Sequence, residues 1–61
     1  VARRSLVAVR DLPTGHRLTA SDLTSKRPAG GIPPSDLAAV LGRTLARPLR
    51  TDAALGWSDL A

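Results

Sequence analysis

Two segments of this chain resemble each other at a constant offset of 37 residues. Residues 10–23 read RDLPTGHRLTASDL and residues 47–60 read RPLRTDAALGWSDL, with seven of fourteen positions identical. Each copy contains an apolar residue, a turn, a second apolar residue and a capped helical turn that ends in leucine. Neither copy can bury its leucines alone, so we expect the two to pack face to face around a pseudo-twofold axis. Chance similarity in a biased composition is the alternative.

The apolar segments are short and are separated by turn-forming residues. Residues 5–9 (SLVAV) predict a strand, and residues 12–15 (LPTG) predict a turn in which the glycine is free to take positive φ. Residues 19–22 (TASD) have the spacing of a helix N-cap with an acidic residue three positions later. This helix is limited to about one turn, because residues 24–27 must be extended ahead of Pro28.

A second helix is predicted to begin at residues 33–36 (PPSD), where proline and an acidic residue suit the first turn. Its buried stripe is expected to comprise Leu37, Val40 and Leu41, and Gly42 ends it. Short extended pieces at residues 44–46 and Leu49, a turn at 51–53 and a helical turn at 58–60 complete the chain. The predicted core is Leu6, Ala8, Leu12, Leu18, Leu23, Ile32, Leu37, Val40, Leu45, Leu55 and Leu60.

The sequence therefore predicts a single domain over residues 1–61, mainly β with short helical turns. A chain of 61 residues buries only about 60% of the surface that its unfolded form exposes, and without cysteine it has no disulfide. The net charge of +4 comes from scattered basic residues, with Trp57 the one aromatic residue, so nucleic-acid binding is not expected. No apolar run is long enough to span a membrane, and we expect a cytoplasmic protein.

Few residues suggest chemistry. His16 lies in a polar turn with no apparent catalytic partner, and we interpret it as a surface residue. Asp22, Asp36 and Asp59 are interpreted as caps of helical turns rather than catalytic carboxylates. Trp57 is interpreted as a packed or partly exposed anchor. The sequence shows no metal-binding set, nucleophile–base pair or phosphate loop, so no catalytic residue, metal site or cofactor is assigned to this domain.

Several motifs together resemble the C-terminal SAF domain of N-acetylneuraminate (sialic acid) synthases. They are RSLVA at 4–8, LPxG at 12–15, LTxxDL at 18–23, KRP at 26–28, GIxP at 31–34 and LGR at 41–43. The first three are shared by SAF domains generally, whereas KRP, GIxP and LGR are more typical of the synthases. The resemblance implies the β-clip fold of SAF and type III antifreeze proteins, which contains an internal pseudo-twofold repeat.

In those synthases a (β/α)₈ barrel condenses phosphoenolpyruvate with an N-acylmannosamine-type sugar, assisted by a divalent metal ion in the barrel. The SAF domain caps the barrel of the other subunit in a domain-swapped homodimer, and one of its arginines contacts the N-acyl group of the sugar. The matching position here is Arg27. The resemblance thus implies an accessory domain of a transferase, without a complete active site of its own.

The residues around Arg27 offer an argument of their own. Pro28 favours an extended conformation at Arg27, and the loop 29–31 allows a partner or ligand to approach the backbone closely. A guanidinium suits an amide carbonyl or a carboxylate. From the residues alone, an arginine that is solvated or caps a carbonyl within the domain is the simpler interpretation. The resemblance favours a substrate-contacting arginine instead. Lys26 is expected to point the other way, to the surface.

Two other SAF functions stay open. A SAF module of a pilus- or flagellum-assembly protein would share the LPTG and LT segments, although KRP and GI fit it less well. An ice-binding antifreeze protein needs a flat, uncharged face. The corresponding stretch here carries Arg10, Arg17, Ser21 and Asp22, with Thr19 alone in keeping, so antifreeze activity is not expected.

Overall fold

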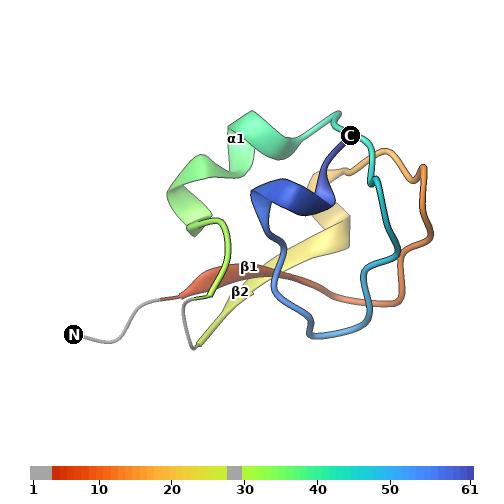
Figure 1. Cartoon of the computed structure of the whole chain (residues 1–61). Coiled ribbons are helices and arrows are strands. Elements are labelled where there is room, and N and C mark those ends of the chain that lie inside the picture. The colour runs from red at the N-terminus through yellow and green to blue at the C-terminus, as the bar shows by residue number, and fades with distance from the viewer. Residues whose placement is uncertain (1–3, 28–29) are drawn as a thin grey trace.

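The computed structural model describes residues 4–27 and 30–61 as a small domain with few regular elements (Figure 1). In chain order these are strand β1 (Ser5–Ala8), 3₁₀ turn η1 (Ala20–Asp22), strand β2 (Leu23–Lys26), 3₁₀ turn η2 (Pro34–Asp36), helix α1 (Leu37–Val40) and 3₁₀ turn η3 (Trp57–Asp59). Pro28 and Ala29, the latter the first residue of the loop predicted at 29–31, lie outside the described residues. No helix in the described part is long and apolar enough to cross a membrane.

Strand β1 is hydrogen-bonded along both of its edges. On one edge it pairs antiparallel with β2, in a register that runs from Ser5 opposite Lys26 to Ala8 opposite Leu23. On the other edge, Leu6 N donates to Ile32 O at 2.9 Å, and Leu55 N donates to Leu6 O at 2.8 Å. All four residues of β1 are buried. The strand predicted at residues 5–9 is therefore confirmed, except that Val9 lies beyond its end.

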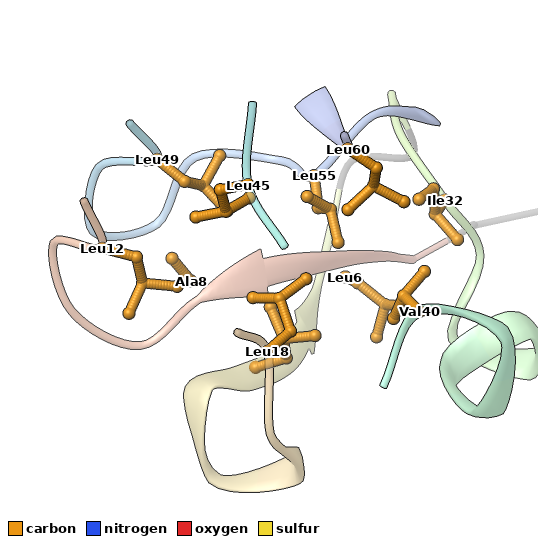
Figure 2. Close-up of a cluster of buried hydrophobic side chains, with 11 residues drawn as sticks. Leu6, Ala8, Leu12, Leu18, Ile32, Val40, Leu45, Leu49, Leu55 and Leu60 are labelled. Carbon is orange, nitrogen blue, oxygen red and sulfur yellow. The ribbon is translucent and has the colours of Figure 1, made fainter. Parts of the chain in front are cut away.

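The hydrophobic core gathers around β1 (Figure 2). Its buried members are Leu6, Ala8, Leu12, Leu18, Leu23, Ile32, Val40, Leu45, Leu49, Leu55 and Leu60. Ten of these were expected from the sequence, and Leu37 packs against them while staying partly exposed. Leu49 was missed, because a single leucine between a proline and an arginine carries no periodic pattern.

The prediction that Leu41 belongs to the buried stripe is wrong. Leu41 is 38% exposed. Helix α1 ends at Val40, and Leu41 has extended backbone angles (φ −63°, ψ 132°), so it does not continue the helical face. Gly42 then takes φ +84°, which confirms it as the residue that ends the helix. Gly15 likewise takes positive φ in the predicted turn, at +85°.

Backbone hydrogen bonds recur at the 37-residue spacing of the two similar segments. Bonds within one segment and its flank have counterparts: Val9 N to Asp22 O matches Ala46 N to Asp59 O. A bond that runs from the first half to the second has a counterpart that runs the other way. Leu18 N donates to Arg43 O, and at the equivalent positions Leu55 N donates to Leu6 O. Leu12 and Leu49, which occupy equivalent positions, donate to each other at 2.7 and 2.8 Å.

Gly31 sits where two backbone segments approach each other closely. A Cβ atom at this position would lie 2.2 Å from Leu55 O, the same carbonyl that accepts a hydrogen bond from Ile32 N at 2.8 Å. A Cβ at Gly30 would meet no heavy atom within 4 Å. Gly31 therefore serves the internal contact with residue 55.

We predict that Gly31→Ala lowers the free energy of unfolding by about 1–3 kcal/mol, because the methyl group forces two hydrogen-bonded segments apart. Gly30→Ala is the matched control and should stay within about 1 kcal/mol of the parent protein. Urea denaturation followed by circular dichroism measures both. Equal losses for the two variants would contradict the close contact.

Candidate functional site

Arg27 lies at a bend directly after β2 and is exposed. It makes no hydrogen bond or ion pair with any other residue of the described part. Other arginines are engaged within the domain: Arg10 contacts Asp22, Arg43 donates to Ala61 O at 3.1 Å, and Arg47 lies 3.5 Å from Asp59. The guanidinium at the end of β2 is thus free to donate hydrogen bonds to a ligand.

The residues on either side of this strand end are held by side-chain contacts. Lys26 Nζ lies 2.6 Å from Asp52 Oδ1, with both side chains about half exposed (51% and 59%). Arg4 donates from Nε to Ser25 Oγ at 3.2 Å and from Nη2 to Ser25 O at 3.0 Å. Lys26 is exposed, as expected from the sequence. The end of β2 is therefore fixed to two other parts of the chain.

A second polar cluster surrounds Asp22, which is fully buried (0% exposed). Its Oδ2 accepts hydrogen bonds from Thr19 N at 2.8 Å and Thr19 Oγ1 at 2.9 Å, and Arg10 contacts its Oδ1. The bond from Thr19 N confirms Asp22 as a cap of η1. Asp59 caps η3 in the same way, accepting a bond from Gly56 N at 2.8 Å.

His16 belongs to this cluster, so the interpretation of His16 as a lone surface residue is wrong. Its Nε2 lies 2.8 Å from Asp22 Oδ2, and its side chain is only 29% exposed. The turn at residues 13–16 folds back beside η1, a proximity that no local sequence pattern signals. Asp22 is also removed from the exposed face on which an ice-binding surface would have to lie.

Asp22 is ionised in the folded protein. Burial raises the pKa of its carboxyl, but the hydrogen bonds from His16 and Thr19 outweigh this and bring the pKa from 3.8 down to about 2. An ionised carboxylate only accepts hydrogen bonds, so His16 carries its proton on Nε2. The cluster ties the turn at residues 13–16 to η1 and contains no nucleophile–base pair.

A shallow groove of about 380 Å³ lies at the other end of β1 from Arg27. Leu12, Leu49 and two prolines line it, with Asp11 and Arg50 at its rim. Thr51 donates to Asp11 Oδ1 through its backbone N at 2.8 Å and its Oγ1 at 3.0 Å, and these bonds lower the pKa of Asp11. The groove is not part of the surroundings of Arg27.

The described residues contain no group of three or more His, Cys, Asp or Glu side chains that could hold a metal ion. Asp36, interpreted as a cap, makes no side-chain hydrogen bond to its helix. Trp57 is 52% exposed, in keeping with a partly exposed anchor. Arg27 differs from the other exposed arginines without a side-chain hydrogen bond in the described part of the chain, because it lies directly after a strand end that two neighbouring side-chain contacts hold.

We predict that the protein loses roughly 2 kcal/mol of stability as the pH falls from about 4 to about 2. The folded-state pKa of Asp22 lies below its unfolded value, so its contribution is present above pH 4 and disappears as the folded state takes up the proton. Urea denaturation across this pH range measures the loss.

Asp22→Asn should remove the part of that pH dependence that comes from Asp22 and cost about 1–3 kcal/mol near neutral pH, because buried charge-assisted bonds are lost. Asp59→Asn is the matched control. Asp59 occupies the equivalent position with a more exposed side chain (17% against 1%), so its replacement should cost less than about 1 kcal/mol. A larger cost at Asp59 would show that the Asp22 cluster is not the stronger of the two.

Comparison with known proteins agrees with this architecture. The sequence model of the SAF domain matches residues 3–61. A protein of Methanocaldococcus jannaschii, described only as uncharacterized, is 36% identical over 59 residues, which cover 97% of this chain. The chain spans 18% of the length of that relative. A match over nearly the whole sequence shows that the chain belongs to the SAF domain family.

Proposed function

We propose that this SAF domain is the accessory C-terminal module of a sialic acid synthase-type enzyme. Such an enzyme condenses phosphoenolpyruvate with an N-acylmannosamine-type sugar. The observation that carries the proposal is the exposed Arg27 at the fixed end of β2, which has no partner among the described residues. It is supported by the KRP, GIxP and LGR motifs, which resemble those of the synthases more than those of other SAF proteins.

In the proposed arrangement the domain covers the mouth of a catalytic barrel, that of the other subunit in a domain-swapped homodimer. Arg27 donates hydrogen bonds to the N-acyl carbonyl of the sugar and helps to orient it. The divalent metal ion and the groups that carry out the condensation belong to the barrel. The SAF domain contributes binding and the exclusion of water, and the reaction takes place in the cytoplasm.

The length of the archaeal relative is compatible with this arrangement. The matched segment is 18% of that protein, which leaves roughly 270 residues for other domains, and a (β/α)₈ barrel typically takes about 250. A module of a pilus- or flagellum-assembly protein is the second candidate, and no contact among the described residues favours it over the synthase.

We also propose that the fold is a β-clip built from two copies related by a pseudo-twofold axis. The recurrence of backbone hydrogen bonds at a spacing of 37 residues supports it, as does the mutual pairing of Leu12 with Leu49. The exchange of partners between the halves is the pattern expected when each copy completes the other's core.

We predict that Arg27→Ala in the full-length enzyme lowers kcat/KM for N-acetylmannosamine by roughly tenfold to hundredfold, with KM for phosphoenolpyruvate little changed. Steady-state kinetics measures this, and the melting temperature should stay at the parent value. Arg17→Ala, which removes another exposed arginine, is the matched control. Unchanged kinetics for Arg27→Ala would remove this residue from the substrate site and contradict the proposal.

Antifreeze activity is expected to be absent. Arg10 and Arg17 are both exposed on the stretch that would have to face ice, and charged side chains prevent a flat, weakly hydrated surface. Measurement of freezing-point hysteresis on the purified protein checks this. Clear ice-crystal shaping would contradict it.

A further inference from the structure

Asp52 adopts a backbone conformation that favours glycine. Among residues 4–27 and 30–61 it is the one residue other than glycine with positive φ, at 65°. The equivalent residue 37 positions earlier is Gly15, with φ 85°. A side chain raises the energy of the left-handed conformation, although aspartate tolerates it better than most residues. Glycine would suit this turn as well, and what Asp52 adds to it is a carboxylate.

The carboxylate of Asp52 binds Lys26 across strand β1. Asp52 N donates to Ala8 O at 2.8 Å on the edge of β1 that faces away from β2. Lys26 belongs to β2, on the other edge, and its Nζ lies 2.6 Å from Asp52 Oδ1. The ion pair therefore links two segments that are bonded to opposite edges of β1. This ion pair joins three neighbouring segments at the residue that directly precedes Arg27.

Arg4, which directly precedes β1, also holds the end of β2 through Ser25. Its two hydrogen bonds to Ser25 occupy both the hydroxyl and the carbonyl of that residue. Two of the three cations here, Arg4 and Lys26, are thus engaged within the domain. Of these three, Arg27 is the one without a partner in the described part of the chain.

We infer that Lys26 and Asp52 form a positioning clamp for Arg27. The clamp fixes the end of β2, so that the guanidinium is presented to the sugar in one orientation, and neither clamp residue touches the substrate. An exposed ion pair contributes little to folding stability, so breaking it should leave the fold intact. An arginine held in place beforehand loses less conformational freedom when it binds. This inference rests on the proposed function, because it acts through Arg27.

The test uses the full-length enzyme and the variants Asp52→Gly and Lys26→Met. Asp52→Gly relaxes the left-handed turn, so the melting temperature should stay within about 4 °C of the parent value. KM for N-acetylmannosamine should rise about twofold to fivefold, while kcat changes by less than about twofold. Lys26→Met breaks the same pair without altering the turn and should raise KM equally. Arg17→Met is the control and should leave KM unchanged, because Arg17 is an exposed cation with no side-chain partner within residues 4–27 and 30–61.

Double variants separate the possible outcomes. The Lys26→Met and Asp52→Gly double variant should be no worse than either single variant, because the two residues act as one unit. In an Arg27→Ala background, neither change should raise KM further. A further rise there, or no rise in the parent background, overturns the clamp while the proposed function stands. If Arg27→Ala itself has no effect on KM or kcat/KM, both the clamp and the proposed function fail.

Discussion

Strand β1 is the element on which the rest of the domain depends. It has only four residues, yet all are buried and its backbone is hydrogen-bonded on both edges. A chain this short cannot build a large sheet, so turns and isolated backbone bonds take the place of further strands around β1. Burying one strand completely in this way requires each neighbouring segment to bring its donors and acceptors to a defined position.

The features with functional interest are arranged by that same strand. Strand β2 pairs with one edge of β1 and carries Arg27 beyond its end. The other edge of β1 is hydrogen-bonded to Ile32, the neighbour of Gly31, and to Asp52, which forms the ion pair with Lys26. The proposed substrate contact lies near the end of β1 where Ser5 faces Lys26, whereas Asp52 is bonded to Ala8 at the other end and binds Lys26 through its carboxylate.

The two similar segments place equivalent aspartates in different surroundings. Both end in Ser-Asp-Leu, and both aspartates cap a 3₁₀ turn. Asp22 is fully buried and receives an additional bond from His16, whereas the residue equivalent to His16 in the second segment is Ala53. The ionised carboxylate of Asp22 is therefore the centre of a polar cluster, whereas that of Asp59 is a partly exposed cap.

The sequence by itself determined much of the local structure: the first strand, the turns at Gly15 and Gly42, the two capped turns and ten residues of the core. These features follow from backbone preferences and apolar spacing, which are properties of neighbouring residues. Only the tertiary structure decided that Leu49 is buried, that Leu41 is exposed, that His16 meets Asp22 and that Lys26 reaches Asp52. Each of these depends on segments that meet through the folding of the whole chain, and no local pattern specifies such a contact.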